Sequence, residues 1–275
     1  MGKNKIAKLV IRVLLIFMSV ICIFPFFWLV RSSFMTSSEI FAMPMKWLPE
    51  TLLIENYKNA LTQVPFGRYF INTLIIVFAN VIGSIFSSSF AAFGFSRINF
   101  RGRNFFFVLV LSTMMIPSSV ILIPQFFGWK AVGAYNTFWP LIAPAFFVNA
   151  FFIFLLKQFY SSIPKDYDEA AFIDGAGYIT IYSKVILPLS RPALATVGVF
   201  SFMWNWNDFF GPLIYLKDQK HYTLALGLQS FMGQYVSNWN YLMAASAVVI
   251  VPMIVLFFFA QKAFIEGITF SGIKG

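Results

Sequence analysis

The stretch LVIRVLLIFMSVICIFPFFWLV, residues Leu9–Val30, decides the fold class of this chain because it is apolar over nearly its whole length. Arg12 is the one charged residue within it. A helix needs about 20 predominantly apolar residues to cross the hydrocarbon core of a bilayer, which is about 30 Å thick. The stretch therefore predicts a membrane-spanning helix.

The composition of the whole chain supports the same conclusion. Of its 275 residues, 59% are hydrophobic and 11% are charged, and the mean hydropathy is +0.78. Soluble globular domains are about 45–50% apolar and about 25% charged, so this balance indicates a membrane protein. The single cysteine, Cys22, excludes an internal disulfide, and the single histidine, His221, excludes a metal site built on several histidines. We expect no metal site in this chain.

Five further stretches have the length and hydropathy of membrane spans, which predicts an all-α membrane protein with six transmembrane helices. Pro117, Pro124, Pro140 and Pro144 fall in or beside the third and fourth of them. Because neighbouring helices can satisfy the carbonyl groups that a proline frees, we expect kinks at these positions and not breaks. The six expected spans are Leu9–Val30, Phe70–Phe95, Phe105–Ile123, Phe138–Leu156, Leu194–Leu216 and Tyr241–Ala260.

The basic residues predict which ends of the spans face the cytoplasm. If the N-terminus is cytoplasmic, most of the 20 Lys and Arg residues fall on cytoplasmic segments, as the positive-inside rule requires. We therefore expect both termini in the cytoplasm. The first span reads as a retained anchor, since no small-residue cleavage site follows it. The net charge of +10 is then explained by topology, and nucleic acid is not an expected partner.

The expected cytoplasmic loop between spans four and five, residues 161–193, contains signals for two short helices joined by a bend. Pro164 suits the first position of a helix, and Asp166 in the first turn complements the positive helix end. Gly175 can end that helix in a left-handed conformation. A second helix is expected from Tyr178 to Leu187, ending before Pro188.

The residue spacing in this loop is compatible with two roles. Ala170 and Ala171 share a face of the first helix with Tyr167 and Asp174, and their small side chains would let another surface approach the backbone closely. Such a helix, with an acidic rim, could dock in a basic groove of another protein. Equally, the two helices could simply cap the bundle. The expected rim consists of Asp166, Asp168 and Glu169, and the expected apolar stripe of the second helix consists of Ile179, Tyr182 and Ile186.

Several motifs in the chain resemble those of one transporter family. Glu169-Ala170-Ala171, followed by Asp174-Gly175-Ala176 and then by Ile186–Leu189 and Pro192, is similar to the EAA motif of binding-protein-dependent ABC import permeases. The tail AQKAFIEGITFSGIKG, Ala260–Gly275, resembles the end of carbohydrate-importer permeases of the maltose type, in particular the shorter of the two permease subunits. The segments Met115–Phe127 and Trp204–Leu216 are similar to the same group.

The resemblance implies a division of the chain and a set of partners. Residues 1–68 would form the N-terminal anchor helix and the first extracytoplasmic loop, residues 69–262 the permease core, and residues 263–275 a cytoplasmic tail. It implies a bacterial plasma (inner) membrane protein that forms a heterodimer with a second permease subunit. It further implies two ATP-binding subunits and an extracytoplasmic sugar-binding protein. The residues implied in ATPase coupling are Glu169, Ala170, Ala171, Asp174, Gly175, Leu187 and Pro188.

The chain itself offers no nucleotide site or catalytic site in its sequence. A P-loop needs the pattern G-x-x-x-x-G-K-[ST], and the nearest approach, Gly128 to Gly133, is followed by Ala134 and Tyr135. We expect no catalytic residues and no cofactor in this chain, with ATP and Mg²⁺ bound by the partner subunits. A secondary transporter driven by protons or sodium is the alternative. That class relies on carboxylates or broken helices near the midplane, and only Asp208 offers such a carboxylate.

A substrate path can be sketched from polar residues within the spans. Asp208 lies in the fifth span, and ionisable residues inside spans are rare and usually functional. Aromatic rings beside amide and carboxylate groups suit a sugar, although tryptophans also form interfacial belts and polar groups also tie helices together. The candidates are Trp204, Asn205, Asn207, Asp208, Asn80, Ser84 and Asn149.

The loop between the last two spans is a candidate contact for the binding protein. This role is implied by the family resemblance alone, and an ordinary connecting loop is the alternative. The candidate residues are Gly227, Gln229, Phe231, Gln234 and Tyr235.

Overall fold

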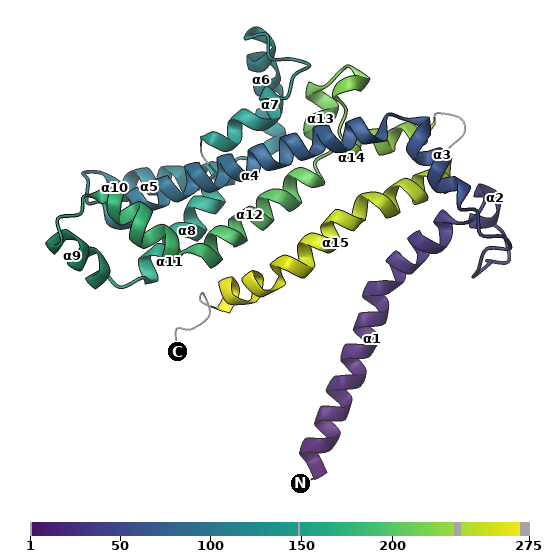
Figure 1. Cartoon of the computed structure of the whole chain (residues 1–275), viewed down its shortest axis with the longest axis horizontal. Helices are drawn as coiled ribbons and strands as arrows, with labels where there is room; N and C mark the ends of the chain where they lie inside the picture. The colour runs from purple at the N-terminus through teal and green to yellow at the C-terminus, as the bar shows by residue number, and fades with distance from the viewer. Residues whose placement is uncertain (1, 148, 234–237, 270–275) are drawn as a thin grey trace. The chain divides into compact units, whose positions relative to one another are not determined.

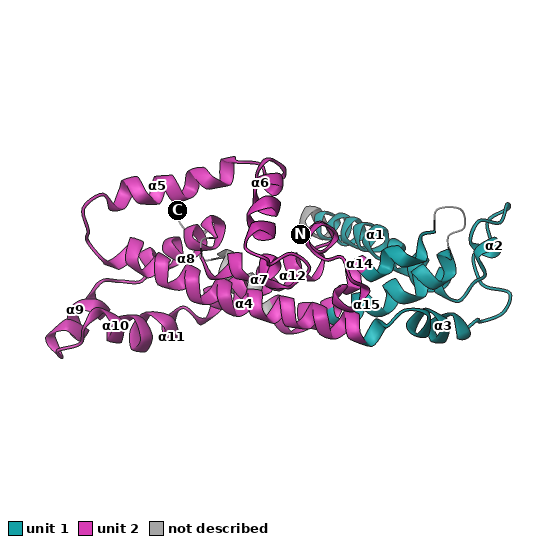
Figure 2. Cartoon of the chain, turned by 90° about the horizontal axis from the view of Figure 1, so that it is seen from above, with its two compact units in different colours: residues 1–67, 227–252 teal, residues 68–226, 253–275 magenta. Residues whose placement is uncertain are grey.

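The structure, a computed structural model, describes residues 2–147, 149–233 and 238–269. Every regular element in these ranges is a helix, as the sequence predicts. The chain forms two compact units, which Figure 2 colours separately. Unit 1 contains residues 1–67 and 227–252, and unit 2 contains residues 68–226 and 253–275.

Unit 1 contains the first apolar helix and the short helices that follow it (Figure 2). The side chains of α1 are exposed from Ile6 to Phe27, which suits a helix that faces lipid or another subunit. The helices that lie wholly or partly in this unit are α1 (Gly2–Ser33), α2 (Ser37–Ile40), α3 (Glu55–Gln63), the first residues of α4 (Phe66–Arg97), the end of α14 (Leu224–Leu228), the 3₁₀ helix η5 (Gln229–Phe231) and the first part of α15 (Trp239–Thr269).

Two asparagines join the helices of unit 1. The buried Asn56 of α3 donates from Nδ2 to the carbonyl oxygens of Ser33 at 3.0 Å and Met35 at 2.9 Å, just after α1. Asn240 of α15 donates to Oδ1 of Asn56 at 3.0 Å. Because the carbonyl groups at a helix end lack partners within the helix, these bonds satisfy them and fix the end of α1 against α3.

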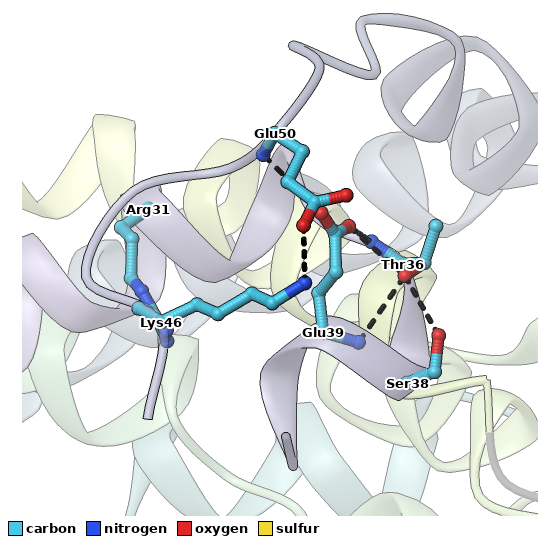
Figure 3. A network of polar contacts seen from close by, with 6 residues as sticks. All are labelled: Arg31, Thr36, Ser38, Glu39, Lys46 and Glu50. Atoms are coloured by element: carbon cyan, nitrogen blue, oxygen red, sulfur yellow. Dashed lines mark hydrogen bonds and ion pairs between the residues drawn. The ribbon is translucent and has the colours of Figure 1, made fainter. Parts of the chain in front are cut away.

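A second polar network lies around Glu39 of α2, and Figure 3 shows it. Oε2 of Glu39 accepts hydrogen bonds from the backbone amide of Thr36 at 2.8 Å and from its hydroxyl at 2.9 Å. Oε1 accepts from the amide of Glu50 at 3.2 Å, across the loop. These bonds, led by that from the Thr36 amide, hold the pKa of Glu39 below its ordinary value.

Unit 2 contains the long helix α4 and the helices that surround it (Figure 1). Its α-helices are α4 (Phe66–Arg97), α5 (Arg103–Ser112), α6 (Ser118–Ala131), α7 (Trp139–Ile142), α8 (Ala150–Ser162), α9 (Asp166–Ile173), α10 (Tyr178–Ile181), α11 (Leu187–Leu189), α12 (Arg191–Trp206), α13 (Phe210–Tyr215) and α14 (Leu224–Leu228), the last of which ends in unit 1. Its other helical turns are η1 (Thr113–Met115), η2 (Ala143–Phe146), the π-helical η3 (Tyr182–Ile186) and η4 (Gln219–His221).

One buried cluster forms the core of unit 2 at the end of α4 that carries Arg97. It joins α4, α8 and α12 to the short helices α10 and η3. Because lipid chains are as apolar as these side chains, their packing inside a membrane protein stabilises the unit mainly through van der Waals contact. The cluster consists of Ala92, Phe93, Phe152, Leu156, Tyr160, Ile181, Ile186, Ala193 and Val197.

The described residues contain four single candidate spans and two bent pairs of helices, and only the second helix of the later pair overlaps the expected fifth span. Spans one, two and six are confirmed by long apolar helices at Ile6–Ser33, Phe66–Arg97 and Trp239–Gln261. The fourth corresponds to Trp139–Ser162. The bent pairs are Arg103–Met115 with Ser119–Ala131, at 99°, and Tyr178–Leu189 with Arg191–Trp206, at 78°.

The third span is broken, so the expectation of a kink at Pro117 is wrong. Ile116 has φ −84° and ψ 116°, an extended conformation. The ring of a following proline disfavours helical geometry in the residue before it, and the two helices on either side of Pro117 meet at 99°. α6 begins at Ser118 and continues through Pro124 without a break.

The fourth span is also interrupted and not merely kinked. Helical structure ends at Phe146, Phe147 has φ −107° and ψ −104°, and α8 begins at Ala150. Side chains of α4 bond to carbonyl groups in this region: Asn80 donates to Leu141 at 2.9 Å and Ser87 donates to Ala145 at 2.9 Å. These bonds supply the partners that an interrupted helix needs inside a membrane.

The fifth span is not the single helix expected over Leu194–Leu216. α12 ends at Trp206, and α13 starts at Phe210. Asp208 therefore lies in the break, where its Oδ1 accepts a hydrogen bond from the amide of Gly211 at 3.1 Å. Because both helices are mainly apolar, the hydropathy pattern of the sequence does not reveal this break.

Candidate functional site

Residues 166–190, called the EAA unit below, form two helical segments joined by a glycine bend, as the sequence predicts. Gly175 has φ +80°, a left-handed conformation that favours glycine because it has no Cβ. Pro164 was expected at the first helical position, but α9 begins two residues later, at Asp166. Both views place α9 and α10 near the end of α4 that carries Arg97 (Figures 1 and 2).

The second segment does not end before Pro188, as the sequence suggested, but continues to Leu189. The π-helical turn Tyr182–Ile186 precedes the proline. Because proline lacks an N–H group and its ring crowds the preceding turn, a local widening of the helix accommodates it. Ser190 then satisfies the carbonyl oxygen of Ile186 with its amide at 3.0 Å and its hydroxyl at 2.6 Å.

The residues of the expected docking face do not all point the same way. Glu169, Ala170, Asp174 and Gly175 are exposed. Ala171 is partly buried and packs against the core cluster of unit 2, so its small size permits close contact within the chain. The face that remains free for a partner is therefore narrower than the four-residue spacing predicts.

Asp168 is not part of an exposed acidic rim. It is buried, and its Oδ2 lies 3.0 Å from Nε of Arg97 on α4. Burial raises the pKa of the Asp168 carboxyl, and the positive charge of Arg97 opposes that shift. Asp166 and Glu169 remain exposed, so the rim is reduced to these two residues.

The apolar stripe of the second segment also differs from the expected one. Ile186 is buried as predicted, and Tyr182 is hydrogen-bonded to Ser89 of α4 at 2.7 Å. Ile179 instead points outward and is 76% exposed, while Ile181 takes the inner position. Near the bend an exposed apolar tip results, formed by Phe172, Ile173, Tyr178 and Ile179.

The polar residues proposed to line a substrate path already make hydrogen bonds within the chain. Trp204 stacks on Phe152 with ring centroids 5.0 Å apart and keeps 48% of its surface exposed. Asn205 donates to the carbonyl of Ser201 at 2.7 Å, and Asn207 donates to that of Met203 at 2.8 Å. Exposed ring surface at Trp204 and the amide of Asn207 remain accessible.

The other path candidates join helices or begin them. Asn80 is buried and bridges α4 to the carbonyl of Leu141. Ser84 is buried 3.4 Å from the hydroxyl of Ser201. Asn149 caps α8, where its Oδ1 accepts from the amide of Phe152 at 3.1 Å.

The binding-protein candidates are partly described. Gln229 is exposed, whereas Gly227 and Phe231 are buried, Phe231 to 2% exposure. Gln234 and Tyr235 lie outside the described residues. Gln229 is therefore the one residue of this group whose described side chain is open to a partner.

Residues 83–269 match the family described as binding-protein-dependent transport system inner membrane component. The chain belongs to this family. It is thus a multi-pass membrane protein and a component of a binding-protein-dependent transport system, and the term permease is used for it below.

Named relatives extend over nearly the whole permease. The arabinooligosaccharides transport system permease protein AraQ of Halalkalibacterium halodurans is 34% identical over 94% of this chain and 94% of its own length. The trehalose/maltose transport system permease protein MalG of Thermococcus litoralis is 31% identical over the full length of both. The diacetylchitobiose uptake system permease protein NgcG of Streptomyces coelicolor is 34% identical over 90% of this chain and 83% of its own length.

A solved structure shares the fold. A chain of a bacterial ABC transporter involved in the import of the acidic polysaccharide alginate superposes with a TM-score of 0.82 and 24% sequence identity, over 95% of this permease and 98% of that chain. The likeness confirms an ABC-importer permease fold for this chain.

Sequence reasoning missed Arg97 and Asn136, which join distant segments of the permease. In the sequence, Arg97 is one of the expected cytoplasmic charges that set topology. Asn136 has φ +61° and bonds to residues 215–218 and to His221. An asparagine in a short loop is a weak signal on its own, because it is equally common in simple turns.

Proposed function

We propose that this permease is the transmembrane subunit of an ABC importer that moves a sugar or oligosaccharide into the cell. The carrying observation is the EAA unit, whose Glu169, Ala170 and Gly175 are exposed at a glycine bend in a chain of the binding-protein-dependent family. The relatives named above for arabinooligosaccharides, trehalose or maltose, and diacetylchitobiose support a carbohydrate as the substrate class.

The EAA unit would dock on the ATP-hydrolysing subunits at the cytoplasmic surface, with both termini on the same side. The exposed apolar tip beside Glu169 supports docking, since exposed apolar patches mark interaction sites. In that interface the tip supplies the buried apolar centre, and Glu169 supplies a charge that sets orientation.

The permease would perform no chemistry of its own. ATP and Mg²⁺ would be bound by the partner subunits, and the energy would arrive through the EAA unit. The remaining partners would be a second permease subunit, an extracytoplasmic sugar-binding protein and the lipid bilayer. Exposure of α1 along its apolar length supports contact with lipid or with that second permease.

Family membership favours this function over an ion-coupled secondary sugar transporter. Asp208, the one intraspan carboxylate on which that alternative depends, accepts a hydrogen bond at the start of α13. Such a bond gives the carboxylate a role that requires no ion coupling.

Uptake into proteoliposomes separates the two functions. The reconstituted importer should accumulate labelled sugar only when two components are present. One is its binding protein, and the other is ATP on the side of the membrane that carries the ATPase subunits. Vesicles with an imposed proton or sodium gradient and no ATP should take up none. Uptake driven by the gradient alone would reject the importer.

A charge reversal tests the docking surface directly. Glu169→Lys should weaken association with the ATPase subunits and abolish transport while the permease still inserts into the membrane. Glu55→Lys makes the same reversal on an exposed residue of α3, outside the EAA unit, and is the control, which should retain association. If Glu169→Lys co-purifies with the ATPase subunits and transports normally, the docking surface lies elsewhere.

A further inference from the structure

The side chain of Arg97, at the end of α4, contacts both the end of α8 and the start of the EAA unit. Nε of Arg97 lies 3.0 Å from Oδ2 of Asp168, and Nη2 of Arg97 donates to the carbonyl oxygen of Ile163 at 2.9 Å. The side chains of the ion pair are 3% and 12% exposed. Nε of Arg97 and Oδ1 of Asp168 have no hydrogen-bond partner in the described part of the chain, so the pair is held by the attraction between two opposite charges that are largely removed from water.

α9 makes only slight apolar contact with the rest of the unit. Of its residues, Ala171 packs against the core cluster, whereas Tyr167, Phe172 and Ile173 are exposed. The second segment of the EAA unit is held differently, by buried Ile181 and Ile186 and by the hydrogen bond between the hydroxyl groups of Tyr182 and Ser89. Within the described residues, the ion pair is therefore one of the main contacts that attach α9 to the rest of unit 2.

The same helix contacts the interruptions on which a substrate path would depend. α4 is a continuous 32-residue helix without an internal proline, and its polar side chains hold several distant loops. Asn80 and Ser87 hold carbonyl groups of Leu141 and Ala145, before the interruption of span four. Further along, Asn72 donates to the carbonyls of Lys220 at 3.0 Å and Tyr222 at 2.9 Å.

We propose that Arg97 is a positioning residue for transport: by fastening α9 to α4, its ion pair with Asp168 makes α4 follow a displacement of the EAA unit. α4 then carries that displacement to the interrupted fourth span through Asn80 and Ser87. The proposal rests on the proposed function, because the displacement originates in the ATPase subunits. A physical link of this kind needs an element with two arrangements that both sites bias, and the proposal assigns that part to α4 because its side chains contact both regions.

The chemistry of arginine matters to this role. Its planar guanidinium lets one side chain donate a hydrogen bond from Nη2 to the Ile163 carbonyl while Nε makes a charge contact with the Asp168 carboxylate at 3.0 Å. A lysine has a single charged nitrogen on a flexible stem. Arg97→Lys should therefore keep the positive charge but lose the simultaneous contacts with Asp168 and with the carbonyl of Ile163.

The test measures sugar transported per ATP hydrolysed in the complete reconstituted importer. Arg97→Lys and Asp168→Asn should lower this ratio at least threefold, while co-purification of the ATPase subunits and ATP hydrolysis itself are retained. Arg101→Met, which removes an exposed charge from the same connection between helices, is the control and should leave the ratio unchanged. Single variants that assemble and keep the wild-type ratio would overturn the proposal.

A double variant covers the case in which the single variants fail to assemble. Arg97→Met with Asp168→Leu replaces both charges by apolar groups and leaves neither one buried without a partner, an exchange that is often neutral for stability. It should assemble and show the same lowered ratio. A wild-type ratio in this variant, or its failure to assemble, would assign the pair to folding alone and reject the positioning role.

The wild-type importer distinguishes failure of this inference from failure of the proposed function. If the wild-type assembly shows ATP-dependent uptake and the variants keep its ratio, only the positioning role of Arg97 is wrong. If the wild-type assembly neither takes up sugar with ATP nor binds ATPase subunits, the proposed function itself is wrong.

Discussion

Nδ2 of Asn136 donates a hydrogen bond to the carboxylate of Asp218 at 2.7 Å, although 82 positions separate the two residues in the chain. Oδ1 of Asn136 accepts from the backbone amides of Lys217 at 2.9 Å and Asp218 at 3.0 Å. The amide of Asn136 itself donates to the carbonyl of Tyr215 at 2.9 Å. One left-handed residue thus fixes the end of α13 and the start of the loop that follows it.

Two substitutions at Asn136 should separate these hydrogen bonds from backbone strain. Asn136→Gly loses the side-chain bonds but tolerates φ +61°, whereas Asn136→Ala loses the bonds and adds left-handed strain. We expect both variants to expose the amides of Lys217 and Asp218 to hydrogen exchange. The alanine variant should be less stable than the glycine variant by about 1 kcal/mol. Undiminished protection of both amides in either variant would contradict this account.

Gly83 allows the fourth span to approach α4. A Cβ placed there would lie 2.8 Å from the ring of Phe146, closer than carbon atoms pack. Gly83→Ala should therefore destabilise the permease by about 1–3 kcal/mol, the usual effect of overpacking. Gly94→Ala is the matched control on the same helix, because nothing lies within 4 Å of its Cβ. Thermal unfolding of the two purified variants in detergent measures the difference, and equal unfolding temperatures would refute it.

The Glu39 network should depend on pH. Because hydrogen bonds lower the pKa of this carboxyl, the ionised form is the one that the fold favours. Its contribution to stability is thus fully present above the ordinary value of 4.5 and is lost as the pH falls through the lower value in the folded chain. The amides of Thr36 and Glu50, which bond to the carboxylate, should lose protection from hydrogen exchange over that range, after correction for intrinsic rates.

Glu39→Gln is the control for this pH dependence. Its amide oxygen can still accept a hydrogen bond, but it carries no charge that acid removes. Protection of the Thr36 and Glu50 amides should be weaker than in the wild type at about pH 7 and unchanged by acid. In the wild-type permease, the Thr36 and Glu50 amides could be equally protected from exchange above and below the pKa of Glu39. That result would show that the carboxylate does not hold the loop between residues 36 and 50.

The parts of the fold that the sequence predicts best are those set by hydrophobic length. Leu9–Val30 and Phe70–Phe95 are long apolar runs, and both form single helices long enough to cross a bilayer. Gly175 was predictable for a different reason, since a glycine between two helical patterns favours a left-handed end.

Breaks within apolar runs were not predictable, because hydropathy does not distinguish a straight helix from a bent one. Pro117 breaks its span and Pro124 does not, although both lie in equally apolar surroundings. What decides is whether nearby groups satisfy the freed carbonyls, which depends on tertiary contacts. The pairing of Asp168 with Arg97 has the same origin, because a helical wheel cannot show that a neighbouring helix ends there.

Asp208 offers a final prediction about the substrate path, because its two proposed roles respond differently to the same pair of substitutions. If it serves to begin α13, it needs only an oxygen that accepts from the amide of Gly211. Asparagine supplies that oxygen and alanine does not. We therefore expect Asp208→Asn to transport normally and Asp208→Ala to lose transport together with about 1 kcal/mol of stability.

A sugar contact that depends on the carboxylate would give the opposite pattern. A carboxylate accepts hydrogen bonds at both oxygens and makes stronger bonds than a neutral amide. Asp208→Asn would then raise the sugar concentration needed for half-maximal uptake while unfolding stayed at the wild-type temperature. Uptake kinetics and thermal unfolding of the two variants, measured on the same reconstituted importer, decide between a structural and a recognition role. The bond to Gly211 favours the structural one, since it already engages Oδ1.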